Sequence, residues 1–245
     1  MFNLNEGLLL LYFAEPSKYY IAFIAFILIT MVSSYLLGSI NSAIIISKLI
    51  YRDDIRKHGS GNPGLTNMLR TYGMKAAGLT LLGDMLKCAL SILLAGVFFG
   101  FHYIRGISNH DGYCYMAGLF AVVGHVFPVY YKFKGGKGVL ATATMALILC
   151  PIPALILIAL FALIVVTSKY VSLGSVSAGV LFPVVVNAYF HIVLNGKTPG
   201  IISLSTIILA ILIVWCHRGN LQRISNRTER KISIGGKKKK EENEE

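Results

Sequence analysis

Long uninterrupted runs of apolar residues are the feature that most constrains how this chain can fold. We mark them at roughly 20–48, 75–100, 113–130, 137–150, 152–167, 172–193 and 200–216. A helix that crosses a bilayer needs roughly 20 such residues. The runs are continuous rather than alternating, which disfavours β-strands. The pattern predicts an all-α, polytopic integral membrane protein with seven transmembrane helices.

The charge content agrees with this interpretation. Only 14% of the residues are charged and the mean hydropathy is +0.67, whereas about a quarter of a soluble domain is charged. We expect one domain over residues 1–230 and a charged, disordered tail over residues 231–245. No Lys or Arg precedes the first apolar residues, so a short interfacial helix ending at Pro16 is favoured over a cleaved signal.

The stretch "CPIP", Cys150 to Pro153, decides the number of helices. Its prolines favour a tight turn between two short helices. The alternative is a single helix over 137–167, which would place the following segments on the opposite sides of the membrane.

Basic residues are distributed unequally between the loops. With seven spans, one side carries the 51–74 and 131–136 loops, Lys137, Lys169 and the tail after Trp215, and the other carries only Lys18, Arg105 and Lys197. Basic loops stay in the cytoplasm. We therefore expect the C-terminus in the cytoplasm, the N-terminus outside, and most of the net charge of +12 against the anionic lipid of one membrane face.

Several classes of function find no support. The four cysteines, Cys88, Cys114, Cys150 and Cys216, are scattered through apolar runs; their spacing fits buried inert thiols rather than a metal site. Basic and aromatic residues do not alternate in a soluble module, so nucleic acid is not an expected partner. We expect neither a metal nor a cofactor.

Two glycine-rich, basic stretches interrupt the apolar runs. In "FKGGKGV", Gly135, Gly136 and Gly138 would let backbone N–H groups approach a ligand, and Lys137 adds a charge at the start of a helix. Such an arrangement is typical of a phosphate site. A flexible basic turn is the alternative.

The second stretch, "RKHGSGNPGLTNMLRTYG", repeats this chemistry. It offers short polar side chains between glycines and a guanidinium suited to phosphate, at Ser60, Gly61, Asn62, Thr66, Asn67 and Arg70. The same residue types occur in any tight turn or helix cap, and that interpretation is the stronger one for this stretch alone.

Polar residues also gather at the ends of the last two runs. In "HRGNLQR", His217, Asn220 and Arg223 are three residues apart, so a continuing helix would place them on one face. "KYVSLGS" adds Ser172 and Ser175. Basic residues that anchor the helix at the interface are the alternative for this region.

Three ionisable residues fall inside apolar runs. Asp84 and Lys87 are spaced to pair on one helix, at a depth where each charge costs about 2.5–3.5 kcal/mol. They fit a structural pair that locks helices as well as a functional pair in a cavity. His125 fits a hydrogen bond between helices better than a catalytic role. Because the polar patches gather on one side, we expect a cytoplasm-facing pocket for a phosphorylated ligand, open laterally to lipid.

Five stretches of the chain resemble, in this order, the signatures of the bacterial acylphosphate-dependent glycerol-3-phosphate acyltransferases, the PlsY family. They are "DIRKHGSGNPGLTNMLRTYG", "GDMLK", "GHVFPVYYKFKGGKGV", "KYVSLGS" and "HRGNLQR". The resemblance implies a seven-helix enzyme of the bacterial cell membrane that moves a fatty acyl group from acyl phosphate to the 1-hydroxyl of glycerol 3-phosphate. The products would be lysophosphatidic acid and phosphate, in the first step of phospholipid biosynthesis. It also implies functional coupling to an enzyme that produces acyl phosphate.

The resemblance and the residue patterns together give a list of candidate site residues. Catalytic roles are expected for Ser60, Lys137, His217 and Asn220, and substrate-binding roles for Gly61, Asn62, Thr66, Asn67, Arg70, Asp84, Lys87, His125, Gly135, Gly136, Gly138, Ser172, Ser175 and Glu229. The base is either His217 or the phosphate of the substrate itself. An organophosphate transporter and a non-catalytic membrane scaffold are the competing functions.

Overall fold

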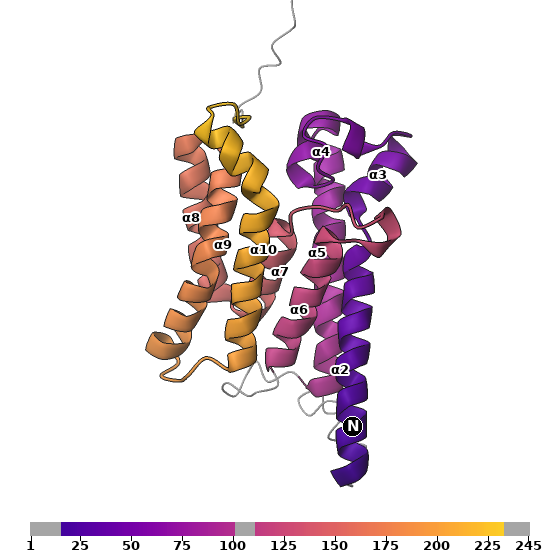
Figure 1. Cartoon of the computed structure of the whole chain (residues 1–245), viewed down its shortest axis with the longest axis vertical. Coiled ribbons are helices and arrows are strands. Elements are labelled where there is room, and N and C mark those ends of the chain that lie inside the picture. Colours follow the sequence, from indigo (N-terminus) through magenta and orange to yellow (C-terminus); the bar gives the residue numbers. More distant parts are fainter. Residues whose placement is uncertain (1–15, 101–110, 233–245) are drawn as a thin grey trace, which may run out of the picture.

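The computed structural model describes residues 16–100 and 111–232, and every regular element among them is helical (Figure 1). The predicted interfacial helix before Pro16 and the tail from residue 233 onward lie outside the described residues. The elements are α2 (Pro16–Ser39), α3 (Ser42–Ile50), η1 (Ile55–Lys57), α4 (Leu65–Tyr72), α5 (Met74–Phe99), α6 (Asp111–Val126), η2 (Val129–Tyr131), α7 (Val139–Leu149), α8 (Pro151–Ser168), α9 (Val171–Ala188), η3 (Tyr189–Val193) and α10 (Gly200–Ser225).

The predicted all-helical membrane architecture is confirmed. Six stretches of the described chain are long and apolar enough to cross a bilayer, and α7 is a shorter apolar helix of 11 residues. Large apolar side chains such as Leu82, Leu155 and Ile211 are exposed on the outside of the bundle, where lipid rather than water would surround them.

The break predicted at "CPIP" is present. α7 ends at Leu149 and α8 begins at Pro151, while Cys150 between them has φ −150° and ψ 72°, outside the helical region. Pro151 occupies the first turn of α8, where its missing N–H leaves no hydrogen bond unmade. A single helix over 137–167 is therefore excluded.

The first apolar run, 20–48, was expected to form one helix, but it is divided into α2 and α3 by a break at Ile40 and Asn41. The Asn41 side chain accepts a hydrogen bond from Ile44 N at 3.0 Å and so caps α3. The polar residues Ser39, Asn41 and Ser42 inside the apolar run are the sequence signal for this break. The predicted 51–74 loop is also partly helical, since it contains η1 and α4.

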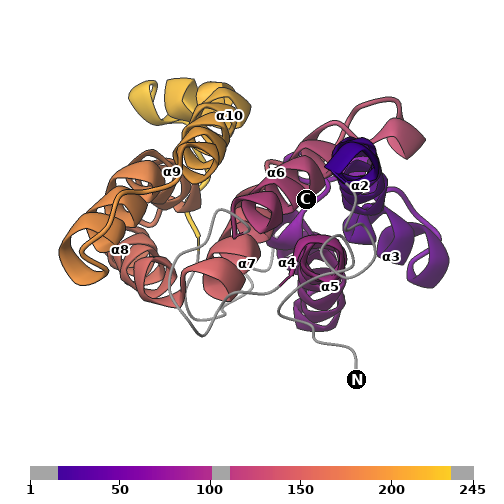
Figure 2. The ribbon, with the colours of Figure 1, turned by 90° about the horizontal axis from the view of Figure 1, so that it is seen from below.

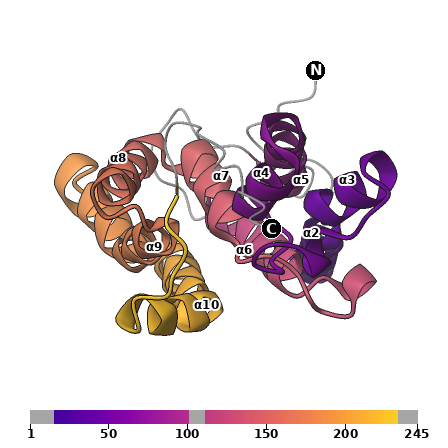
Figure 3. The same cartoon turned by 90° about the horizontal axis from the view of Figure 1, so that it is seen from above.

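The helices form two groups that α7 connects. α2 to α6 lie on one side and α8 to α10 on the other, as Figures 2 and 3 show from opposite ends; α7 packs on α5, α6 and α8, and α10 also contacts α6. Tyr115, Met145, Phe182 and Leu209 belong to the buried core that joins them.

The polar loops gather at one end of this bundle, the upper end in Figure 1. We call residues 51–64 the first loop and residues 127–138 the second loop. The second loop is tied to α2 by the Tyr35 hydroxyl, which donates to Phe127 O at 2.9 Å. The C-terminal segment is tied to the start of α9, because Ile232 N donates to Lys169 O at 2.9 Å.

Candidate functional site: a cavity with a cationic end and an apolar end

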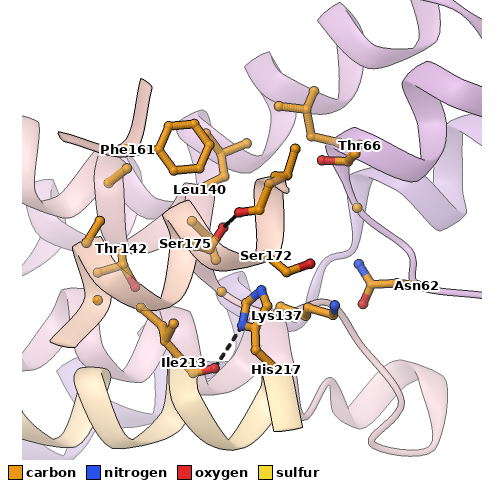
Figure 4. A pocket seen from close by; sticks show the side chains of 18 of the residues that line it. Asn62, Thr66, Lys137, Leu140, Thr142, Phe161, Ser172, Ser175, Ile213 and His217 are labelled. Carbon is orange, nitrogen blue, oxygen red and sulfur yellow. Dashed lines mark hydrogen bonds between the residues drawn. The ribbon is translucent and has the colours of Figure 1, made fainter. Parts of the chain in front are cut away.

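A cavity of about 690 Å³ lies between the two groups of helices and reaches the polar end of the bundle. Its lining comes from the first loop, α4, α5, α6, the second loop, α7, α8, α9, α10 and the C-terminal segment. In Figure 4, the side chains of Lys137, Ser172 and His217 lie close together, whereas Leu140 and Phe161 line another part of the wall. The cavity is therefore polar at one end and apolar at the other.

A hydrogen-bond network fixes the polar end. Lys137 Nζ donates to Asn220 Oδ1 at 2.5 Å, and Asn220 Nδ2 donates to Glu229 Oε1 at 2.6 Å and to Ser172 Oγ at 2.9 Å. The Ser172 hydroxyl also donates to Glu229 Oε1, at 2.5 Å, and Arg223 Nε donates to Glu229 Oε2 at 2.8 Å. One carboxylate thus holds together α9, α10 and, through Asn220, the lysine of the second loop.

The charges at this end favour an anionic ligand. The pKa of the Lys137 ammonium is lowered, chiefly by burial. The carboxylate of Glu229 opposes this shift, and the positive charges of Arg223 and Arg70 add to it. Burial alone would raise the pKa of the Glu229 carboxyl, but the hydrogen bonds from Ser172, Asn220 and Arg223 outweigh it and hold that pKa below its usual value. Because the positive charges of Arg223 and Arg70 act unfavourably on the Lys137 ammonium, a phosphate between them would be stabilised.

His217 faces the same space from α10 and is buried. Its Nδ1 lies 2.8 Å from Ile213 O, a contact that Figure 4 marks. A carbonyl oxygen can only accept, so Nδ1 carries the proton in the neutral ring. Nε2 is then the atom that can accept a hydrogen bond.

The first loop is organised by Asn67 of α4. Its Oδ1 accepts from Ser60 N at 3.1 Å, and its Nδ2 donates to His58 O at 3.0 Å and Ile55 O at 3.3 Å. Asn67 lines the cavity, yet both ends of its amide are bonded within the loop. Asn62 has no such set of partners and points toward the cavity in Figure 4.

The second loop differs from the prediction in the direction of its N–H groups. Gly135 N donates to Val126 O at 3.2 Å and Gly136 N to His125 O at 3.0 Å, so these two groups bind the end of α6 and not a ligand. A Cβ on Gly136 would lie 2.1 Å from His125 Nε2. The glycines are needed here because the loop packs directly on the imidazole; only Gly138 and Lys137 reach the cavity.

The buried ionisable residues gather in the core beside the cavity. Lys87 Nζ lies 3.0 Å from Asp84 Oδ1, 2.9 Å from His125 Nδ1 and 2.7 Å from Ile40 O. Asp84 and His125 line the cavity, but Lys87 does not.

Most of the predicted site residues are brought together. The cavity is lined by Ser60, Asn62, Thr66, Asn67, Arg70, Asp84, His125, Lys137, Gly138, Ser172, Ser175, His217, Asn220 and Glu229. It is not lined by Gly61, Lys87, Gly135 or Gly136.

The sequence reasoning missed the apolar part of the wall and two polar groups. Ala154, Leu157 and Phe161 recur on one face of α8, a spacing that marks a helix face but does not show whether a cavity lies against it. Arg223 was assigned only to a helix face, although it binds Glu229. Thr142 lines the cavity, and its hydroxyl has no hydrogen-bond partner in the described part of the chain.

Within residues 16–100 and 111–232, no three His, Cys, Asp or Glu side chains gather in a way that could hold a metal ion.

Comparison with known proteins identifies the family. The family model described as "Glycerol-3-phosphate acyltransferase" matches residues 28–227. The chain belongs to this family. The expected family membership is thereby confirmed, and with it an integral membrane acyltransferase.

Curated relatives match most of the chain. The glycerol-3-phosphate acyltransferase of Alkaliphilus metalliredigens is 40% identical over 84% of this chain and 95% of its own length. That of Bacillus subtilis is 36% identical over 84% of this chain and 97% of its own.

Two solved structures share the fold. The glycerol 3-phosphate form of PlsY, an integral membrane glycerol 3-phosphate acyltransferase, has a TM-score of 0.72 and 31% identity, covering 84% of this chain and 96% of that one. The lysophosphatidic acid form has a TM-score of 0.68 and 30% identity, with 84% and 95% covered.

Proposed function

We propose that this acyltransferase moves a fatty acyl group from acyl phosphate to the 1-hydroxyl of glycerol 3-phosphate, giving lysophosphatidic acid and inorganic phosphate. This reaction would begin phospholipid biosynthesis. The observation that carries the proposal is that the cationic end and the apolar wall belong to one continuous cavity. The PlsY forms with glycerol 3-phosphate and with lysophosphatidic acid support it by their similarity to this chain.

The apolar wall fits the acyl tail. Leu140, Leu147, Leu157, Phe161 and Phe182 supply it from α7, α8 and α9. Each buried CH₂ contributes about 0.8 kcal/mol, so a long chain contributes on the order of 10 kcal/mol. The tail would occupy this wall while both phosphate groups stay near Lys137.

The cationic end fits the two phosphates. Bringing two anions together opposes the reaction, and Lys137, Arg70 and Arg223 all line the cavity. A charge-assisted hydrogen bond contributes about 1.5–3 kcal/mol. These cations therefore stabilise the transition state, where both anions are closest, more than they stabilise either substrate alone, and this difference lowers the barrier.

The bond changes are few. The glycerol 1-hydroxyl oxygen bonds to the acyl carbon, and the bond from that carbon to the phosphate oxygen breaks. Two groups can take the hydroxyl proton: His217 Nε2 and the phosphate of glycerol 3-phosphate, whose second pKa is about 6. The substrate phosphate is favoured, because His217 Nδ1 bonds to a backbone carbonyl, Ile213 O, and not to a carboxylate that would stabilise an imidazolium.

His217→Gln tests this assignment of the base. Gln retains a hydrogen-bonding group but cannot take up a proton. Because the substrate phosphate is the proposed base, we expect kcat to fall only about tenfold and the pH profile to keep its shape. Loss of turnover together with loss of the acidic limb of the pH profile would instead assign the proton to His217.

The roles proposed for the polar residues follow from their positions. Ser60, Asn62 and Thr66 of the first loop and α4 would bind a substrate phosphate or hydroxyl, with Ser172, Ser175 and Asn220 on the opposite wall. Residues 1–230 would form the catalytic domain and 231–245 an appended tail. We place the polar end at the cytoplasmic face of the bacterial cell membrane, since the excess of Lys and Arg lies there; soluble glycerol 3-phosphate and a donor supplied by an acyl-phosphate-producing enzyme would both reach it.

One assay tests the proposed function. Purified protein in lipid vesicles is supplied with acyl phosphate and labelled glycerol 3-phosphate, and lysophosphatidic acid and phosphate are measured. We expect equal amounts of both products without any thiol-ester donor. Turnover only with a thiol-ester donor would overturn the choice of donor, and labelled glycerol 3-phosphate entering the vesicles without lysophosphatidic acid would show a transporter.

A further inference from the structure

Three buried charged or polar side chains lie between the two loops that form the cationic end. Asp84, Lys87 and His125 are each at most 4% exposed. Burying an ion pair at this depth is costly and adds little net stability over an apolar pair. The contacts of these three side chains indicate a role other than stabilising the fold.

Lys87 makes two hydrogen bonds and one ion pair through its ammonium group. Its Nζ lies 3.0 Å from Asp84 Oδ1, 2.9 Å from His125 Nδ1 and 2.7 Å from Ile40 O. An ammonium has three donors and no acceptor, so His125 Nδ1 accepts and its Nε2 carries the proton. Three elements, α5, α6 and the break after α2, therefore meet at one nitrogen atom.

The contact with Ile40 leads to the first loop. In a continuous helix Ile44 N would bond to Ile40 O, but here it bonds to Asn41 Oδ1 at 3.0 Å, which leaves Ile40 O free for Lys87. The Asn41 amide then donates to Pro63 O of the first loop at 3.3 Å.

The contact with His125 leads to the second loop. The loop turns back at Pro128 and lays Gly135 and Gly136 on the end of α6, where their N–H groups bond to Val126 O and His125 O. A Cβ on Gly136 would lie 2.1 Å from the ring nitrogen Nε2. The next residue is Lys137, which lines the cavity.

We propose that Asp84, Lys87 and His125 form a spacer that sets the separation between the first and second loops, and hence between Asn62 and Lys137 across the cationic end. They are positioning residues, acting through Asn41 and Gly136. The consequence for catalysis rests on the proposed function, whereas the loop separation does not.

The decisive variant combines Asp84→Leu with Lys87→Met. Replacing a buried ion pair with apolar residues of similar size is often neutral or stabilising, so the protein should still fold. Spin labels at Lys57→Cys and Lys134→Cys, both exposed and one in each loop, report the separation in a background that carries Cys216→Ala. We expect a narrow distance distribution in the parent protein and a broad one in the double variant.

The kinetic prediction is a rise of about tenfold in KM for glycerol 3-phosphate, with kcat changed less and an unchanged thermal midpoint. Ser91→Ala is the matched control: Ser91 is buried one turn further along α5 and bonds only to Lys87 O, at 2.9 Å. It should change neither the distances nor KM. If the double variant fails to fold, Gly136→Ala tests the same path while keeping all three side chains, and we expect the same broadening.

Each result decides the proposal. A narrow, unshifted distance distribution in a folded variant would overturn it, whatever the activity. Broad distances with unchanged kinetics would retain the spacer but remove its proposed role in substrate binding. Loss of turnover in every variant and in the parent would contradict the proposed function and leave the distance result standing.

Discussion

The first and second loops are both rich in glycine and basic residues, but different groups hold their conformations. The first loop is held by a side chain, because Asn67 bonds to Ser60 N, His58 O and Ile55 O. The glycine part of the second loop is held by its own backbone, since the N–H groups of Gly135 and Gly136 bond to the end of α6. The first therefore presents neutral polar groups to the cavity and the second presents a single cation, Lys137. Similar glycine content does not imply similar chemistry.

The largest effect should come from the one cation that the second loop sends into the cavity. Lys137→Met removes the charge but keeps the apolar stem, and we expect kcat/KM to fall by about 100-fold or more, since charge-assisted bonds to two phosphates are lost. Lys134→Met is the control, because Lys134 is exposed and does not line the cavity. Equal losses in both variants would mean that overall charge, and not this position, matters.

The side chain that holds the first loop should come next. Asn67→Ala removes three hydrogen bonds and leaves the buried Ile55 O without its side-chain partner, at a cost of about 1–3 kcal/mol in loop stability. We expect kcat/KM to fall about tenfold and amide exchange at Ser60 to accelerate. Asn62→Ala, which breaks none of these bonds, should lower activity without faster exchange at Ser60; faster exchange there would contradict the distinction between the two asparagines.

Glycine substitutions sharpen the comparison within the first loop. Gly59 and Gly61 both have positive φ, +58° and +70°, but a Cβ on Gly59 would lie 2.1 Å from Asn67 Oδ1, whereas on Gly61 its nearest contact is Arg56 O at 3.3 Å. Gly61→Ala should cost about 1 kcal/mol of backbone strain, and Gly59→Ala more, because Asn67 must also move. Thermal midpoints of the two purified variants give the order; the reverse order would show that Asn67 is not the element that holds the loop.

The smallest effect concerns pH and the C-terminal segment. Glu229 holds the C-terminal segment against α9 and α10, and its pKa in the folded protein is below its usual value of 4.5. The stabilisation of this segment by Glu229 is therefore fully present above pH 4.5 and is lost as pH falls through the lower folded pKa. A spin label at Lys231→Cys should keep constant mobility from pH 7 to pH 5 and become mobile only in stronger acid. In Glu229→Gln the mobility should no longer depend on pH; a transition near neutral pH in the parent would assign the docking to another group.

Part of this arrangement could be predicted from the chain alone. The apolar runs and the prolines at "CPIP" fix the helices, because in lipid the backbone must satisfy its hydrogen bonds within each helix. The spacing of His217, Asn220 and Arg223 predicts one face of a continuing helix, and α10 does extend to Ser225. These features depend on neighbours within a few residues, so local sequence determines them.

Tertiary structure decided the direction in which each group points. Glycine supplies conformational freedom but not an orientation, and only the packing of the second loop on His125 turned the N–H groups of Gly135 and Gly136 away from the cavity. Likewise the sequence placed Asp84 and Lys87 on one helix, but their partners, Ile40 O and His125, come from 47 and 38 residues away from Lys87. Contacts between distant segments follow from how the helices pack, and no local pattern encodes them.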